Sequence, residues 1–98
     1  MKNYIITYQI RNPWEYYGDF YDAIKKNYPE YQHALEESWF IKTDDEPQKI
    51  IDNIKSYLKK NDSVFVVEIT DKYAGWMPKS LWKWLKLENG YESLGNTE

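Results

Sequence analysis

The sequence predicts an α+β fold in which two helices pack on one face of a sheet of four strands. Four short segments rich in aromatic and β-branched residues indicate the strands. Two segments whose apolar residues recur at intervals of three and four positions indicate the helices. The resulting order is β-α-β-β-α-β followed by a third helix rich in tryptophan. This is the split βαβ order of a ferredoxin-like sandwich.

The predicted strands are short and carry apolar residues on both sides. We expect them at residues 2–10, 32–35, 38–43 and 63–69. In the first strand, Tyr4, Ile6 and Tyr8 point to one side of the sheet. Ile5 points to the other side, so both faces of the sheet need a cover. The two main helices cover one face, and the C-terminal helix or a second copy of the chain is expected to cover the other.

The first helix is expected over residues 14–27. Its regular part begins near Asp19, because Gly18 weakens the first turn. Pro29 prevents its continuation.

The second helix is expected to begin at Pro47 and to end at Asn61-Asp62. Its acidic start, Asp44-Asp45-Glu46, is interpreted as capping of the helix and complementation of its dipole. The third helix is expected from Pro78 to about Leu87.

The chain of 98 residues fits one domain. We expect that domain to span residues 1–88, including the third helix, and residues 89–98 to form a polar, frayed tail. The first residues lack the pattern of a signal peptide. No run approaches the roughly 20 apolar residues of a membrane helix. We therefore expect a cytoplasmic protein without membrane association.

The composition narrows the kinds of site that the chain can form. It contains no cysteine and one histidine, so disulfides, thiolate metal sites and a zinc ligand set are excluded. We expect no cofactor and no metal site. The net charge of −3 argues against a protein that binds nucleic acid mainly through its phosphates, because proteins of that kind are usually basic.

Three stretches are similar to a known family: YIITY at residues 4–8, HALEESWFIKT at 33–43 and NDSVFVVEI at 61–69. They resemble the small SinR-like proteins, which are related in fold to the CRISPR spacer-acquisition endoribonuclease-like subunit and to VapD-type toxins. The resemblance covers most of residues 3–70, and it implies a ferredoxin-like fold and a homodimer.

The resemblance does not carry a catalytic residue over to this chain. In the nuclease relatives the first strand ends in Tyr-Asp, and that Asp is implicated in Mg²⁺ binding. Gln9 stands at the matching position here, and a neutral amide is a poor ligand for Mg²⁺ and cannot act as a general base. A nuclease would need another carboxylate, such as Asp19 or Glu68.

His33 and Glu68 are the remaining candidates for chemistry. His33 is interpreted as structural, bonded to a neighbouring backbone group, and the alternative is that it acts with Ser38 or a nearby acid. Glu68 lies on the strand face opposite Phe65 and Val67. If its face is covered, Glu68 needs a basic partner. The candidate partners are Lys2, Arg11 and Lys42.

The aromatic content is high, with ten Tyr, five Trp and three Phe. Part of it is expected to form a binding surface, because Tyr and Trp are favoured at interfaces. The candidate binding residues are Trp14, Tyr16, Tyr17, Trp76, Lys79, Trp82 and Lys83. For the C-terminal set, two interpretations stay open. One is a stacking and phosphate-binding surface; the other is a helix packed on the sheet by its tryptophans, with the lysines in solvent.

These observations together favour a non-catalytic protein-interaction module that is homodimeric and binds a protein partner. One hypothesis, based on composition alone, is a phage or mobile-element factor that inhibits a host or defence protein. The alternatives are a divalent-metal-dependent nuclease and a protein that binds nucleic acid without cleaving it. The nucleic-acid alternative predicts binding that weakens steeply with salt.

Overall fold

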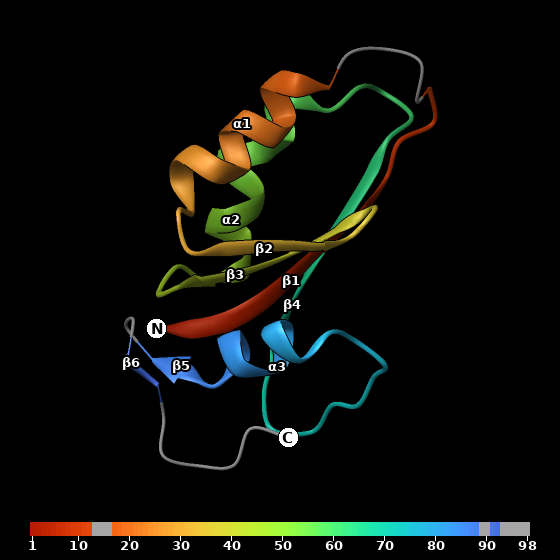
Figure 1. The fold of residues 1–98 in the computed structure, drawn as a ribbon. Coiled ribbons are helices and arrows are strands. Elements are labelled where there is room, and N and C mark those ends of the chain that lie inside the picture. The colour runs from red at the N-terminus through yellow and green to blue at the C-terminus, as the bar shows by residue number, and fades with distance from the viewer. Residues whose placement is uncertain (13–16, 89–90, 93–98) are drawn as a thin grey trace.

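A four-stranded antiparallel sheet with the order β2-β3-β1-β4 organises the chain. The structure, a computed structural model, describes residues 1–12, 17–88 and 91–92. Its sheet consists of β1 (Lys2–Gln9), β2 (Tyr31–Leu35), β3 (Ser38–Thr43) and β4 (Ser63–Ile69), as Figure 1 shows. The predicted strands at 38–43 and 63–69 are confirmed residue for residue. The other two differ from the prediction by one residue each.

Three α-helices are present in the described part of the chain. These are α1 (Gly18–Asn27), α2 (Pro47–Ile54) and α3 (Lys79–Leu85). The α+β class is therefore confirmed, and the strand order is compatible with the expected arrangement. The predicted start of the first helix at residue 14 lies outside the described residues, and the helix is regular from Gly18 onward.

The second helix is shorter than the sequence predicts. It ends at Ile54 and continues as a single 3₁₀ turn, η1 (Lys55–Tyr57). Beyond this 3₁₀ turn, the Asp62 carboxylate accepts hydrogen bonds from the backbone N–H of Lys59 at 2.8 Å and of Arg11 at 3.0 Å. These bonds hold the segment before β4 in a turn, which is incompatible with a continued helix.

The acidic start of α2 has a different role from the expected cap. Glu46 is the N-cap residue, but its side chain makes no capping bond among the described residues. Instead Lys2 Nζ donates to Glu46 Oε2 at 3.3 Å, and the N-terminal ammonium lies 3.7 Å from Asp44 Oδ1. The cluster therefore ties the start of β1 to the start of α2, because the opposite charges of the two elements meet there.

The chain continues after α3 into two short strands. Leu87 does not extend the third helix but begins β5 (Leu87–Glu88), which pairs antiparallel with β6 (Tyr91–Glu92). The sequence between them is Asn-Gly, the dipeptide most typical of two-residue hairpins. The rest of the predicted tail lies outside the described residues.

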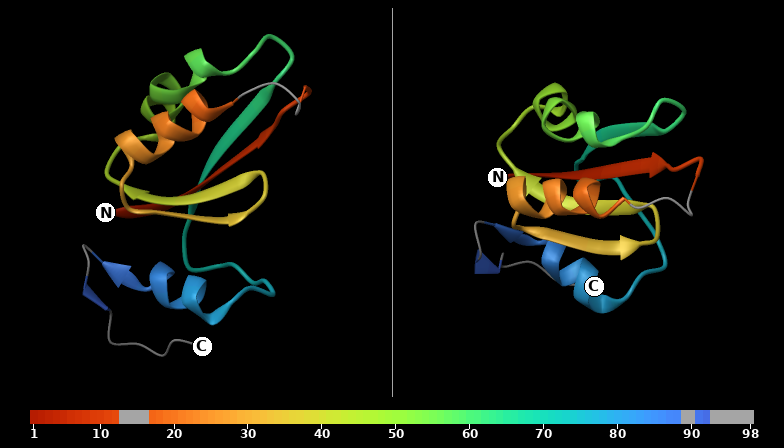
Figure 2. Two further views of the ribbon diagram at one scale, coloured as in Figure 1. Left: turned by 45° about the horizontal axis from the view of Figure 1, so that its top comes forward. Right: turned by 90° about the horizontal axis from the view of Figure 1, so that it is seen from above.

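α1 and α2 cover one face of the sheet, which we call the helix-covered face (Figure 2). Tyr4, Ile6 and Tyr8 point to this side and are buried, as predicted from their alternation. They pack against apolar residues of both helices and of β3. The members from those elements are Phe20, Ala23, Ile24, Trp39, Ile41, Ile50 and Ile54.

Two buried tyrosines on β1 have different polar surroundings. Trp39 Nε1 donates a hydrogen bond to the Tyr8 hydroxyl at 2.9 Å, inside the core. The Tyr8 ring also meets Phe20 edge to face, with centroids 5.0 Å apart. The Tyr4 hydroxyl is buried and has no hydrogen-bond partner among the described residues. Burial raises the pKa of both phenols.

We expect Tyr8→Phe to destabilise the fold by about 1–3 kcal/mol, because it leaves the buried Trp39 N–H without an acceptor. Tyr4→Phe removes a hydroxyl that has no partner, so its free energy of unfolding should stay within about 1 kcal/mol of wild type or rise. Urea unfolding of the two variants measures the difference. Equal destabilisation by both substitutions would contradict this account of the core.

Tyr28, the residue after α1, is bonded to the β3–α2 connection and to the last turn of α2. Its hydroxyl donates to Asp45 Oδ2 at 3.0 Å and accepts from Asn53 Nδ2 at 2.9 Å. Burial raises the pKa of Tyr28 from 10.0 to about 12, and the bond from Asn53 works against the rise. The folded protein therefore holds this proton more tightly than the unfolded chain does.

The pKa of Tyr28 predicts a loss of stability in alkali. Below pH 10.0 the phenol is protonated in both states, so its full contribution is present. As the pH rises from there toward about 12, the unfolded chain loses the proton while the folded protein keeps it, and the free energy of unfolding falls. Urea unfolding at about pH 9 and about pH 11 should show a smaller fall in Tyr28→Phe than in wild type. An identical fall in both would contradict the assignment.

Candidate functional site

The sheet face opposite α1 and α2, here called the open face, is covered in part by α3 (Figure 2). Phe40 of β3 is buried there together with three residues of α3. Those three are Leu81, Trp84 and Leu85. Trp84 and Leu85 follow Leu81 by three and four positions, so all three share one side of the helix. The tryptophan-rich helix thus packs on the sheet of its own chain.

Polar contacts fix the position of α3. Asn3 Nδ2 donates to the carbonyl oxygen of Leu85 at 3.1 Å. Lys42 Nζ donates to Asn3 Oδ1 at 2.8 Å and lies 4.2 Å from the centroid of the Trp84 ring. Because Lys42 is only 3% exposed, its charge depends on the hydrogen bond and on the ring face for stabilisation.

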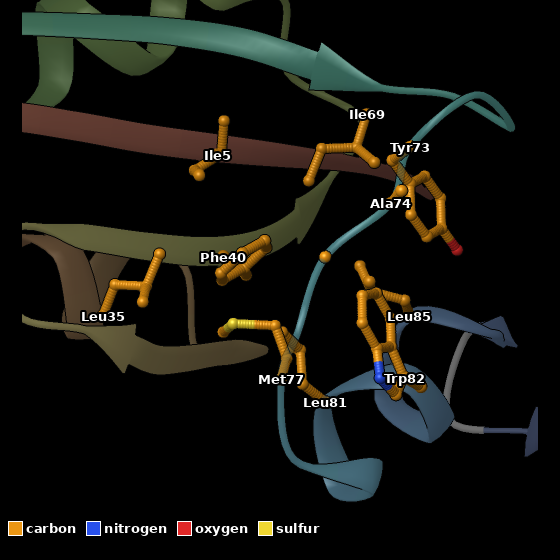
Figure 3. Close-up of a pocket in the computed structure, with 11 residues that line it drawn as sticks. Ile5, Leu35, Phe40, Ile69, Tyr73, Ala74, Met77, Leu81, Trp82 and Leu85 are labelled. Carbon is orange, nitrogen blue, oxygen red and sulfur yellow. The ribbon is translucent and has the colours of Figure 1, made fainter. Parts of the chain in front are cut away.

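An apolar pocket of about 350 Å³ lies between the open face, the segment 73–77 and α3 (Figure 3). Strand side chains form its floor, and side chains of the segment and of α3 form its opposite wall. The lining consists of Ile5, Leu35, Phe40, Ile69, Tyr73, Ala74, Gly75, Met77, Leu81, Trp82 and Leu85. Its size and apolar character are those of sites that bind small ligands or the side chains of a partner.

The pocket continues into an exposed apolar strip on β4. The register places Val67 beside Ile5 of the pocket floor and Phe65 beside Thr7, all on the open face. Phe65 is 65% exposed and Val67 is 43% exposed. α3 therefore leaves this part of the sheet uncovered, and the apolar surface extends beyond the pocket itself.

Three of the predicted binding residues meet beside the pocket. Trp76, Lys79 and Trp82 line a second hollow of about 240 Å³, together with Gly75 and Met77. Trp76 is 99% exposed. The Trp82 ring is half-buried and stacks on Tyr73, with ring centroids 6.0 Å apart.

The other predicted binding residues lie elsewhere. Lys83 is exposed on α3, one turn after Lys79. Tyr17 is buried in the core on the helix-covered face, where its hydroxyl donates to Asp62 Oδ2 at 2.7 Å. Trp14 and Tyr16 lie outside the described residues.

His33 has the contacts of a structural histidine. Its ring stacks on Trp39 with centroids 4.1 Å apart, and its Nε2 lies 3.1 Å from the carbonyl oxygen of Glu36. The Ser38 hydroxyl instead donates to Thr7 Oγ1 at 3.0 Å. The contact with the Glu36 carbonyl is the one that the structural interpretation of His33 predicts, and the Ser38 hydroxyl bonds to Thr7 and not to His33. A role of His33 with Ser38 or a nearby acid stays a prediction.

The carboxylates that a nuclease would need are not brought together. Gln9 lies on the open face, because it pairs with Ser63, whereas Glu68 pairs with Tyr4 on the helix-covered side. Glu68 is exposed, so it needs no basic partner. Asp19 lies in the first turn of α1. Among the described residues, no three His, Asp or Glu side chains gather as metal ligands.

Sequence reasoning identified the exposed aromatic residue Trp76 but missed the pocket floor. Ile5, Phe40 and Ile69 read simply as strand residues, and nothing local to them indicates an unfilled space. The available signal was the presence of apolar residues on both sides of the strands, combined with a third helix too short to cover a whole sheet face.

Comparisons with protein-family models, with curated proteins and with solved structures give no match for this chain. Within the residues that the structure describes, no helix combines the length and the apolar character needed to cross a bilayer. The candidate site therefore has to be interpreted from its own geometry.

The tryptophans of the C-terminal segment should differ sharply in their effect on stability. Trp84→Ala removes a buried ring and its contact with Lys42, so we expect a cost of about 3–5 kcal/mol or separate unfolding of α3. Trp76→Ala removes a ring in solvent and should change the free energy of unfolding by less than about 0.5 kcal/mol. Urea unfolding followed by circular dichroism makes the comparison. A large loss with Trp76→Ala would mean that this ring is part of the fold and not of a binding surface.

Proposed function

We propose that this protein is a non-catalytic interaction module that binds a segment of a partner protein in the pocket of the open face. The observation that carries the proposal is the apolar pocket of about 350 Å³, flanked by the almost fully exposed Trp76 and by Phe65. Tryptophan is enriched among the residues that dominate binding energy at protein interfaces. A ring that contributes little to the fold but lies beside a pocket is suited to that role.

The charges around the hollow define the chemistry of the partner. Lys79 lies in the wall of the hollow that contains Trp76, and Lys83 follows one turn later on the same helix. The protein as a whole carries a net charge of −3, so this basic area is local. We therefore propose a partner segment with an apolar or aromatic anchor for the pocket and acidic residues beside it.

We further propose that the fold is of the ferredoxin-like type. The order of elements is β-α-β-β-α-β, and the strand order β2-β3-β1-β4 with antiparallel neighbours supports this assignment. In such an arrangement both main helices lie on one side of the sheet. The opposite side is then available for α3 and for a partner.

Selection from a library of random peptides of about twelve residues on the immobilised protein tests the proposal. We expect enrichment of peptides with an aromatic or aliphatic anchor and acidic neighbours. Trp76→Ala should weaken their binding, measured by fluorescence anisotropy, by at least about tenfold. Lys79→Glu should also weaken it, because it places like charges together.

Matched substitutions on other parts of the surface serve as controls. Tyr57→Ala removes an exposed aromatic ring in η1, and Lys26→Glu reverses an exposed charge in α1. Neither should change peptide affinity. Binding that is unaffected by Trp76→Ala and by Lys79→Glu would refute the proposed site. Binding of a single-stranded oligonucleotide that falls steeply with salt, with no enriched peptide, would establish a nucleic-acid surface instead.

A further inference from the structure

The pocket of the open face is larger than one side chain of a partner needs. Its volume is about 350 Å³. An apolar cavity of about 150 Å³ is sufficient to bind benzene. The pocket therefore has room for about two rings side by side, and a single aromatic anchor would leave much of it unfilled.

The chemistry of the lining favours a body without polar groups. Ile5 and Phe40 belong to the floor, and among the described lining residues only Tyr73 and Trp82 carry a side-chain O–H or N–H group. Figure 3 shows the Tyr73 oxygen directed away from the side chains of the floor. A peptide backbone inside the pocket would leave most of its own polar groups without partners, which is unfavourable. Rings built of carbon carry no such cost.

The second hollow gives this apolar space a cationic neighbour. Gly75, Met77 and Trp82 line both hollows, so the two spaces adjoin. Lys79 lines the second hollow, is exposed and forms no ion pair within the described part of the chain. Residues 70–86 contain four lysines and one aspartate, although the whole chain carries a net charge of −3. An anionic group that leaves the pocket at this end is therefore attracted to Lys79.

Gly75 leaves the junction of the two hollows free of side-chain atoms. A Cβ at this position would lie 3.3 Å from Cη2 of Trp82 and 3.6 Å from Cγ of Met77. A larger residue would therefore crowd the Trp82 ring and narrow the passage between the hollows. A molecule that occupies both hollows crosses at this glycine.

We infer that the pocket binds a small amphipathic carboxylic acid whose apolar body consists of two rings. The rings fill the pocket, and the carboxylate lies in the second hollow beside Lys79. The volume and the apolar lining are those of small-ligand sites, in which a few polar groups fix the orientation of the ligand. This inference goes beyond the proposed function, because it requires no protein partner. Since the acid occupies the space of the partner's anchor, the two compete, and the acid regulates partner binding.

Naphthalene-2-carboxylate, which has two fused rings and one carboxylate, is the probe for this site. Titration of the ¹⁵N-labelled protein followed by NMR should give a dissociation constant of about 0.1–1 mM, in keeping with the affinity per atom of small ligands. Chemical shifts should change for lining residues such as Ile5, Phe40 and Gly75 and stay constant on α1. No binding up to about 5 mM, or shifts centred on the helix-covered face, would overturn the inference.

Two related compounds test the two parts of the ligand. Benzoate has one ring and should bind at least about fivefold more weakly, because it leaves apolar surface of the pocket uncovered. Naphthalene-2-carboxamide has the same rings without the charge and should bind about threefold more weakly, because Lys79 is exposed and its attraction is screened. Equal affinity of benzoate would refute the two-ring body. Equal affinity of the carboxamide would refute the contact with Lys79.

Substitutions with matched controls locate the rings and the carboxylate. Ala74→Leu extends a lining residue into the pocket and should weaken the binding of naphthalene-2-carboxylate at least about fivefold. Thr70→Leu, on the same exposed segment but outside the lining, should not. Lys79→Glu should abolish the preference for the carboxylate over the carboxamide, whereas Lys26→Glu on α1 should preserve it. Full affinity in Ala74→Leu, or an intact preference in Lys79→Glu, would contradict the inference.

Competition between the acid and a partner segment is measured with the anisotropy assay proposed above. Naphthalene-2-carboxylate should displace an enriched peptide from the protein, and a complex that holds both would refute the regulation of partner binding. The NMR titrations contain no peptide. Failure of the ligand site and failure of the proposed function are therefore separate results.

Discussion

Apolar side chains occupy both faces of this sheet, and water must be excluded from each. Neighbouring residues of β1, such as Ile5 and Ile6, point to opposite sides and both pack in hydrophobic clusters. α1 and α2 together exclude water from one face. The other face receives α3, whose seven residues are too few to cover four strands. The pocket, the exposed strip on β4 and the position of the C-terminal segment all follow from this unequal cover.

The two covers differ in chemistry as well as in extent. On the helix-covered face, Trp39 is hydrogen-bonded to Tyr8 and Tyr28 to Asp45, whereas the buried Tyr4 hydroxyl has no partner among the described residues. On the open face, α3 is held by four buried apolar or aromatic residues and by the Asn3 and Lys42 contacts. Because fewer buried residues hold α3, we expect its local unfolding to require less free energy than the unfolding of α1 and α2. A binding surface at the less stable layer can adapt to a partner without disturbing the main core.

The sequence was sufficient for most of the sheet and insufficient for what depends on tertiary contacts. β3 and β4 could be predicted to the residue, because aromatic and β-branched runs are bounded there by polar turns. The end of α2 could not, because apolar periodicity continues through Leu58 while the Asp62 carboxylate determines the turn. Trp76 and Lys79 could be identified from composition. The pocket floor could not, because an unfilled space is defined by how far α3 reaches and not by any local pattern.

β4 extends the apolar surface beyond the pocket that we propose as the binding site. Its exposed side chains, Phe65 and Val67, lie on the open face beyond the end of α3. Val67 lies beside Ile5 of the pocket floor, so the pocket and the exposed strip form one apolar surface. Both parts of this surface exist because a helix of seven residues cannot cover a sheet of four strands.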